Sequence, residues 1–341
     1  MSSSTRRAIS LVSLLLSVLS GVTAAQSTEQ RTSLYLDRVR KQPGLLLAFL
    51  RDMPKGGDLH NHLDGAMYAE DLIDFAVDGN LCVDRTSSRL IAPPCDPCET
   101  YTAKPAVRCA YGDHVLYNQM IDAWSMRNWT PGEESGHDHF FAAFDKFDLA
   151  SHTHVAEAIA AATNRAGMDH LQYVEFMHTA DAGGAGHVAG KVEWNPDFAK
   201  MRDALLAAGL RDVVSETSKR LAADDARAHE ILKCGTPDAA QGCGVTVRYL
   251  YQVLRGLPHQ VVFAQILLGF EWIMLLSGPR QPCRRIPVVV DLTTINDNVA
   301  GAIRADRDLR RRFTDNHARF AAYRAHDLVL HRYSCDSPLT K

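Results

Sequence analysis

The residues with the clearest chemical potential lie near position 60, where two histidines and a carboxylate alternate as His60, His62 and Asp64. The pattern predicts a short strand, and successive side chains of a strand point to opposite faces. His60, His62 and Asp64 are therefore expected on one face, with Leu59 and Leu63 on the other. Since two neutral imidazoles on one face can bind one divalent metal, the sequence predicts half of a metal site here.

His-x-His spacing by itself is weak evidence for a metal site. The chain has 15 histidines in 341 residues, and at that density about one such pair arises by chance. Two more pairs occur, His137 with His139 and His152 with His154, in or beside segments with helical apolar spacing. Helical positions i and i+2 point about 200° apart. For these two pairs we favour surface or capping histidines over metal ligands.

The residues around His60 resemble the adenosine deaminase family, whose first barrel strand combines Met-Pro-Lys with Leu-His-x-His-Leu-x-Gly. Here Met53-Pro54-Lys55 precedes Leu59-His60-Asn61-His62-Leu63-Asp64-Gly65. The chain is most similar to the secreted branch related to adenosine deaminase growth factors. The resemblance continues through Gly136–Phe147, Tyr173–Met177 and Val247–Arg255, and it ends at Gly269–Glu271.

This resemblance implies an α/β fold, the metal-dependent hydrolase (β/α) barrel, of which the chain carries the N-terminal part with a cysteine-containing insertion. It also implies Zn²⁺ held by His60 and His62, and a zinc-bound hydroxide that adds to C6 of a purine nucleoside such as adenosine or deoxyadenosine. Asp64 matches the position that hydrogen-bonds the ribose, although an Asp that caps the turn at Gly65 is an equal alternative.

An aromatic helical face is predicted from the spacing of Phe140, Phe141, Phe144 and Phe147. Core packing explains such a face without any ligand. In the family this segment is an apolar gate over the nucleoside, so the resemblance makes Phe140 and Phe144 candidates for substrate binding. Glu175 lies inside an apolar strand, where an unpaired carboxylate would be costly, and we expect it to have a buried partner.

Several parts of the family's active site are not found in residues 1–341. No His-Ala-Gly-Glu segment supplies a third zinc histidine and a general acid, no later histidine is recognisable beside the attacking water, and the only Asp-Asp pair, Asp224-Asp225, falls within a predicted helix. The catalytic residues therefore remain unassigned. Two functions stay open: a zinc-dependent adenosine deaminase, and a truncated or frameshifted remnant that has lost catalysis.

Composition changes where the resemblance ends. From residue 272 onward the chain has no Glu and only Lys341 among lysines, while arginine is frequent. A shift of reading frame near residue 271 and a divergent C-terminal module both explain this. Val288–Thr294 resembles a late barrel strand of the family, which instead suggests an internal loss. We therefore divide the chain into a barrel part, 53–271, with an insertion at 80–135, and an unmatched Arg-rich tail, 272–341.

The N-terminus predicts export. Residues 1–25 have a basic pair, an apolar run and small residues at the end, as in a signal peptide. Residues 26–52 form a predicted helical extension, placed where the secreted branch has a dimerising segment, so a homodimer is one option. The formal charge of -3 gives no case for nucleic acid or an anionic membrane. We expect a secreted or periplasmic protein that has no membrane anchor once the signal is removed.

Eight cysteines in an exported chain favour disulfides. Four of them, Cys82, Cys95, Cys98 and Cys109, lie in the insertion, where a structural zinc knot is the alternative. We also predict a local disulfide between Cys234 and Cys243.

The remaining elements alternate between helix and strand, which argues for a parallel sheet. The predicted helices are 156–166, 198–208 and 211–230, and the predicted strands are 171–177 and 245–251.

Overall fold

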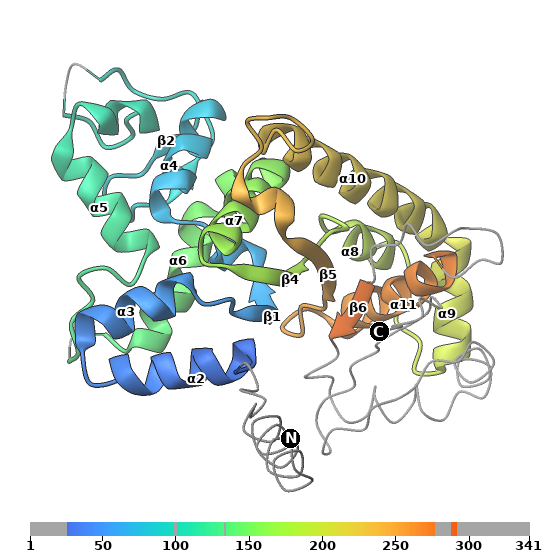
Figure 1. Ribbon diagram of the computed structural model, residues 1–341. Helices are drawn as coiled ribbons and strands as arrows, with labels where there is room; N and C mark the ends of the chain where they lie inside the picture. The colour runs from blue at the N-terminus through green and yellow to red at the C-terminus, as the bar shows by residue number, and fades with distance from the viewer. Residues whose placement is uncertain (1–25, 99–100, 133, 277–287, 292–341) are drawn as a thin grey trace, which may run out of the picture. The chain divides into compact units, whose positions relative to one another are not determined.

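The computed structural model of the chain (Figure 1) describes residues 26–98, 101–132, 134–276 and 288–291. The chain divides into two compact units, residues 1–53 and 54–341. The predicted signal peptide lies outside the described residues, as does most of the predicted tail. None of the described helices has the length and apolar character needed to cross a membrane.

The first unit is a pair of helices, α2 (Thr28–Val39) and α3 (Pro43–Asp52). Ser27 and Gln30 form a reciprocal capping box that starts α2, since each side chain accepts from the other residue's backbone N–H. Proline at the first position of α3 has the helical φ angle already. The rings of Tyr35 and Phe49 pack 5.7 Å apart between the two helices.

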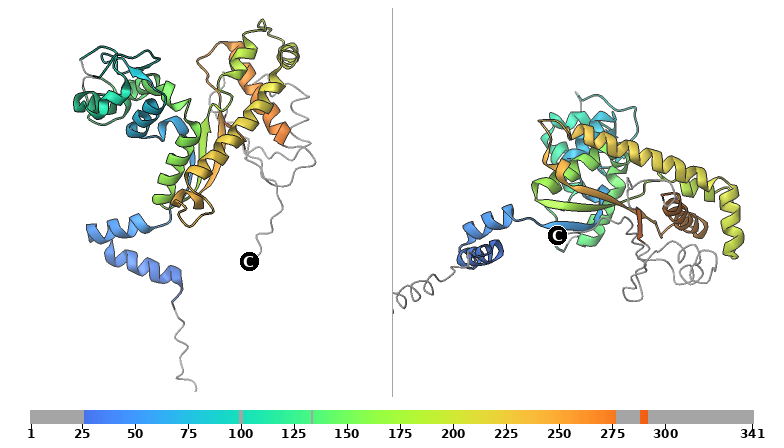
Figure 2. Two further views of the ribbon diagram at one scale, coloured as in Figure 1. Left: turned by 90° about the horizontal axis from the view of Figure 1, so that it is seen from above. Right: turned by 45° about the vertical axis from the view of Figure 1, so that its right-hand side comes forward.

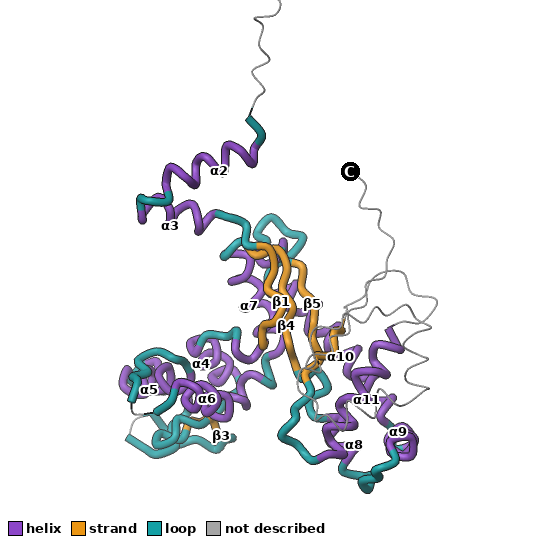
Figure 3. The backbone as a smooth tube through the Cα atoms, turned by 90° about the horizontal axis from the view of Figure 1, so that it is seen from below, coloured by secondary structure: helices purple, strands orange, loops and turns teal. Residues whose placement is uncertain are grey.

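A four-stranded parallel sheet organises the second unit (Figure 3). Its strands, in spatial order, are β1 (Gly56–His62), β4 (Leu171–His178), β5 (Thr246–Gln252) and β6 (Val288–Asp291). All three neighbouring pairs are parallel. The predicted α/β class with a parallel sheet is therefore confirmed, and within the described residues the sheet is open.

Helical crossovers connect these strands, as parallel pairing requires. The long helix α10 runs beside the sheet and packs against α7 and α11 (Figure 2). The connecting helices of the second unit are α4 (Ala69–Asp78), α6 (Gly136–Ser151), α7 (Val155–Met168), α8 (Gly184–Ala189), α9 (Phe198–Ala207), α10 (Leu210–Ile231) and α11 (His259–Leu276). The helices and strands predicted from periodicity after residue 155 are all confirmed, with boundaries shifted by at most two residues.

The two faces of the sheet differ in what covers them. Phe176 pairs with Tyr249, and His178 with Tyr251, so these four side chains share the face on which the large core forms. The next position along, Met177 paired with Leu250, faces the other way and forms a small separate cluster. The main core therefore lies on one side of the sheet.

The insertion is more regular than the sequence indicated. It contains the short hairpin β2 (Cys82–Val83) with β3 (Leu90–Ile91), the 3-10 helix η2 (Val107–Tyr111) and an α-helix, α5 (His114–Trp124). All four cysteines of the insertion are paired, in the disulfides Cys82–Cys95 and Cys98–Cys109. The alternative of a zinc knot is therefore wrong.

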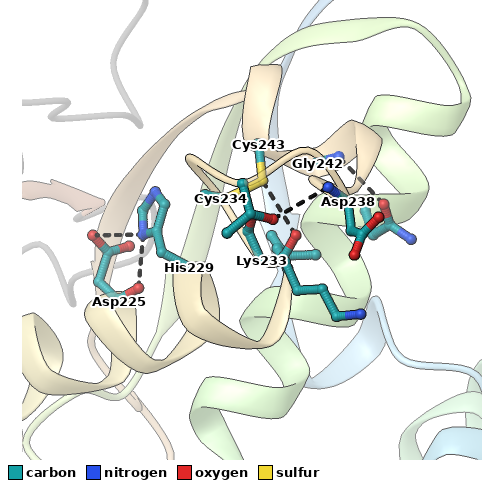
Figure 4. Close-up of a disulfide and its surroundings, with 10 residues drawn as sticks. Asp225, His229, Lys233, Cys234, Asp238, Gly242 and Cys243 are labelled. Atoms are coloured by element: carbon teal, nitrogen blue, oxygen red, sulfur yellow. Dashed lines mark hydrogen bonds and ion pairs between the residues drawn. A yellow bond between two sulfur atoms is a disulfide. The ribbon is translucent and has the colours of Figure 1, made fainter.

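The predicted disulfide Cys234–Cys243 is confirmed, and it ties the end of α10 to the 3-10 helix η3 (Gln241–Gly244) (Figure 4). Close to it, Gly242 N donates to the side-chain oxygen of Asn164, 3.2 Å away on α7. A Cβ added at Gly167 would lie 2.5 Å from the carbonyl carbon of Gln241. Glycine is therefore required where α7 and η3 meet.

Two further predictions concern single features. Glu175 is 6% exposed and accepts a hydrogen bond of 2.6 Å from the Tyr173 hydroxyl, so it has the expected partner, although Tyr173 is half-buried rather than buried. In the region of the predicted tail, α11 continues to Leu276 and residues 288–291 pair with β5 as a parallel strand. The rest of that region lies outside the described residues.

Candidate functional site

The candidate site begins at the carboxyl end of β1, the end of parallel strands where α/β folds usually place their ligands. The strand is not regular on its way there. Its register with β4 shifts between Asp58 and Asn61. The Asp58 carboxylate accepts from the backbone N of His60 at 3.2 Å and from the Asn61 side chain at 2.8 Å. This local bonding replaces part of the ladder and produces a bulge.

The bulge leaves the two histidines together. The ring centroids of His60 and His62 lie 5.4 Å apart, with the ring planes at 64°. The strict alternation predicted for the apolar residues is wrong, because Leu59 is 64% exposed at the bulge whereas Leu63 is 1% exposed.

Asp64 was predicted on the same strand face as the histidines, and this prediction is also wrong. The strand ends at His62, and the 3-10 helix η1 (Leu63–Gly65) follows, closed by a 3.1 Å hydrogen bond from Ala66 N to Leu63 O. The turn rotates Asp64 away from the strand face, where it becomes half-buried in the wall of a pocket. Strand alternation therefore does not explain the position of Asp64.

The pocket has a volume of about 240 Å³ and two chemically different walls. The first wall comes from η1 and the start of α4, and it includes Asp64, Tyr68 and Glu70. The second comes from the end of α5, the residues directly after it and α6, and it is mainly aromatic. Its side chains are Trp124, Met126, Phe140, Phe144 and Phe147.

The predicted aromatic face of α6 is present for Phe140, Phe144 and Phe147, but including Phe141 was wrong, because Phe141 is 58% exposed and does not line the pocket. Ring centroids are 5.1 Å apart for Phe140 and Phe144, and 5.4 Å apart for Phe144 and Phe147. Phe147 is 4% exposed and belongs to the core, whereas Phe140 is 42% exposed. The face therefore runs from the core to solvent, and both predicted readings, core packing and pocket wall, describe part of it.

Gly65 connects this pocket to the histidines. A Cβ built on Gly65 would lie 3.6 Å from Cζ of Phe144 and 3.9 Å from Cβ of His62. Only the width of this one residue separates the aromatic wall from His62. The structure thus gathers Asp64, Phe140 and Phe144 into one pocket and places His62 immediately next to it.

The charge of the lining also restricts the ligand. Among the described residues that line the pocket, Asp64 and Glu70 are acidic and none is Lys or Arg. Carboxylates accept hydrogen bonds from hydroxyl groups and repel anions. The walls therefore disfavour an anionic ligand and suit one that has a flat apolar part and a hydroxylated part.

His178 is a nearby titratable residue that the sequence did not single out. It ends β4, is 7% exposed, and its Nδ1 has no hydrogen-bond partner among the described residues. Burial lowers the pKa of His178, and the negative charge of Asp64 opposes that effect. Its position directly after the apolar run Tyr173–Met177 was a signal, because that position is the carboxyl end of a predicted strand.

The sheet register decides whether His178 can join the histidine pair. His62 pairs with Met177, so it shares the face of Met177, and His178 points to the opposite face. Its neighbour there is Tyr251, whose pKa is raised well above 10.0 by burial and by the charge of Asp181. His178 therefore belongs to the core beneath the helices rather than to the histidine pair.

The described residues do not complete a zinc site. Nowhere among them do three or more His, Cys, Asp or Glu side chains gather in a way that could hold a metal ion. A zinc site uses three or four protein ligands. His60 and His62 supply two imidazoles, so the fit to zinc is partial.

The other histidine pairs have structural contacts. His139 contacts Glu134 and two backbone carbonyls, and His137 pairs with Asp138. His154 precedes α7, and its ring stacks on Phe75 at 5.1 Å. The preference for surface or capping roles thus agrees with the geometry.

The Asp224-Asp225 pair lies within α10, as predicted. Asp225 accepts a hydrogen bond of 3.0 Å from the Tyr249 hydroxyl, and burial raises the pKa of Asp224. Asp225 therefore packs against β5 of the sheet, and Asp224 is partly buried.

Comparisons with known proteins found no matching family model, no matching curated protein and no matching solved structure.

Proposed function

We propose that this chain is an adenosine deaminase whose pocket at η1 and α6 holds a purine nucleoside, and that its reaction is the zinc-dependent hydrolysis of adenosine to inosine and ammonia. The observation that supports this most directly is the pocket itself. Asp64 and the pair Phe140 and Phe144 are far apart in sequence, yet they line one cavity beside His62.

The walls of the pocket suit the two halves of a nucleoside. Aromatic rings stack favourably on a flat base, and Phe140 and Phe144 offer such rings. The carboxylate of Asp64 can accept a hydrogen bond from a ribose hydroxyl. The base would therefore lie along α6 with the sugar towards η1.

We further propose that the sheet is the first part of a metal-dependent hydrolase barrel. In such a barrel consecutive strands are parallel neighbours joined by helices. The order β1, β4, β5, β6 has this property, and the disulfide-bonded insertion lies within the first crossover. Closure of the barrel would require strands beyond residue 291.

When bound, zinc would supply a hydroxide nucleophile at neutral pH. His60 and His62 would hold it through two imidazole nitrogens. Among the described residues no third ligand joins the two histidines, and the general acid is unassigned.

A second candidate is a protein that binds nucleosides without turning them over. The sequence favours it, because no His-Ala-Gly-Glu segment occurs in residues 1–341. Both candidates use the same pocket, and they differ in zinc binding and turnover.

We also propose that the protein works outside the cytoplasm, either secreted or periplasmic. Its three disulfides support this location, and every cysteine of the described residues is paired. A homodimer formed through the helices of residues 26–52 is an additional proposal, which gel filtration with light scattering would test.

One set of measurements separates the two functions. Purified full-length chain is assayed for bound zinc, for the change in absorbance when adenosine becomes inosine, and for adenosine binding by calorimetry. Stoichiometric zinc that is lost in the His60→Ala/His62→Ala variant, together with turnover, supports the deaminase.

Adenosine binding without turnover supports the second candidate. In either case Phe144→Ala should weaken binding, while Phe141→Ala should not, because Phe141 is 58% exposed on the same helix and does not line the pocket. Absence of both binding and turnover would refute both functions.

A further inference from the structure

One residue of the acidic wall, Tyr68, has an unusual support. It lines the pocket and is 60% exposed, yet its ring packs against a charged side chain. The guanidinium carbon of Arg165 lies 3.9 Å from the centre of the Tyr68 ring, which is the geometry of a cation–π contact. Tyr68 precedes α4 and Arg165 belongs to α7, so the contact links two helices.

Arg165 is itself fixed. Its Nη2 donates to both carboxylate oxygens of Asp71, at 2.7 and 2.5 Å. The two side chains are only 25% and 22% exposed, so solvent weakens this pair less than a surface ion pair. The carboxylate of Asp71 in turn accepts from the backbone N of Tyr68 at 2.9 Å.

These three contacts link Tyr68, Asp71 and Arg165 into a cycle, in which each residue contacts the other two. Asp71 holds the backbone of Tyr68, Arg165 covers one face of the ring, and Asp71 orients Arg165. The Tyr68 hydroxyl makes no hydrogen bond to any other residue that the structure describes. These contacts therefore hold the ring of Tyr68 in the pocket wall and leave its hydroxyl available to a ligand.

We infer that Tyr68 contacts the sugar of the bound nucleoside and determines specificity for it, and that Arg165 is a positioning residue that acts through Tyr68. This inference rests on the proposed nucleoside binding. In the proposed binding mode the base lies against the aromatic wall of α6, so the sugar meets the other wall, to which Asp64, Tyr68 and Glu70 belong. A tyrosine ring can pack on the C–H face of a ribose while its hydroxyl bonds a sugar hydroxyl.

The contribution of Arg165 has an upper limit. Because Arg165 acts only through its contact with Tyr68, it cannot contribute more free energy to ligand binding than that contact provides. For a partly exposed cation–π contact this limit corresponds to about two- to five-fold in Kd. Tyr68 touches the ligand directly, and the loss of one hydrogen bond and its packing corresponds to about ten-fold.

The test compares adenosine with adenine, which has the base but no sugar. Calorimetry on full-length chain gives Kd for both ligands in wild type, Tyr68→Leu, Arg165→Gln, Arg165→Lys and the double variant Tyr68→Leu/Arg165→Gln. We expect Tyr68→Leu to weaken adenosine binding about ten-fold and Arg165→Gln two- to five-fold, with adenine unchanged. In the double variant, Arg165→Gln should add nothing.

Arg165→Lys keeps the positive charge beside Asp71 but loses the planar stack, so it should resemble Arg165→Gln for adenosine. If Arg165→Gln does not fold, Arg165→Lys replaces it in the comparison. Equal weakening of adenosine and adenine would assign Arg165 a general structural role and overturn the inference. So would an effect of Arg165→Gln that persists without Tyr68.

The outcome for the proposed function is separate. If adenosine binds and depends on Phe144, but the ratio of adenosine to adenine affinity is unaltered by Tyr68→Leu, the inference fails and the proposed function stands. If wild type binds neither ligand, both fail.

Discussion

Protonation of His139 should stabilise the contact between α6 and the end of α5. Its Nδ1 lies 2.9 Å from a carboxylate oxygen of Glu134, and its Nε2 lies 3.0 Å from the carbonyl of Ser125 and 3.2 Å from that of Asp122. Acceptors therefore face both ring nitrogens. Only the imidazolium carries a proton on each nitrogen, so only the charged form can donate to both sides.

The pKa of His139 is accordingly raised above 6.5, chiefly by the hydrogen bond to Glu134, although burial opposes the shift. A folded-state pKa above the unfolded value means that the charged form stabilises the fold. This stabilisation is fully present below about pH 6.5 and is lost as the pH rises through the folded-state pKa.

The expected size follows from the contacts. A hydrogen bond to a charged group contributes about 1.5–3 kcal/mol when it is well shielded. The His139 side chain is 15% exposed, but that of Glu134 is 46% exposed, so solvent screening reduces the gain. We expect the free energy of unfolding to fall by about 1 kcal/mol across the transition.

Urea denaturation of wild type and His139→Gln between about pH 5.5 and 8.5 measures this effect. The unfolding free energy of wild type should exceed that of His139→Gln most at low pH, and this difference should become smaller as the pH rises. His137→Gln is the matched control, because His137 also faces a carboxylate at 3.0 Å, but both partners are at least 70% exposed. A difference that is independent of pH, or an equal effect in His137→Gln, would refute the reasoning.

Two further predictions concern stability around η3. Replacing Cys234 and Cys243 with serine opens a loop with a sequence separation of 9, and the loss of that constraint should lower the unfolding free energy in urea by about 2.7 kcal/mol; an unchanged midpoint would contradict this. Gly167→Ala should cost about 1–3 kcal/mol, because its methyl group would overlap the backbone of Gln241, whereas Gly244→Ala, which meets nothing within 4 Å, should be tolerated sterically. Thermal melting of both variants provides the comparison.

The sequence predicted well wherever one strong local pattern determined the structure. The apolar run at Leu171 became β4, and the long amphipathic pattern after Leu210 became α10. The disulfide between Cys234 and Cys243 followed from its short loop. In these cases the periodicity of burial and the shortness of a loop are properties of the local chain.

Prediction was less successful where side chains compete with the backbone. Nothing in the alternation of β1 showed that Asp58 would bond His60 N and Asn61 and create a bulge. The turn that moves Asp64 off the strand is likewise set by one backbone hydrogen bond. Helix α5 had a readable signal in its Asp113 cap, which the cysteine-rich context obscured.

Contacts between distant segments could not be read from one sequence. Arg165 stacks on Tyr68 across about a hundred residues, and both are ordinary types for a helix surface or a turn. For the candidate site, the resemblance pointed to Asp64, Phe140 and Phe144, and the structure showed that they line one cavity. The closeness of His62 to that cavity depends on Gly65, which has no side chain to occupy the space between them.

The pairing of β1 with β4 has a consequence for the order of folding. It joins His62 to Met177, so roughly a hundred residues of chain must be arranged before these strands meet. Such distant pairings form slowly, and helices, whose contacts are local, form before them. Since η1 directly follows β1, the pocket should be among the last parts of the second unit to form, and hydrogen exchange during refolding should protect α7 and α10 before β1.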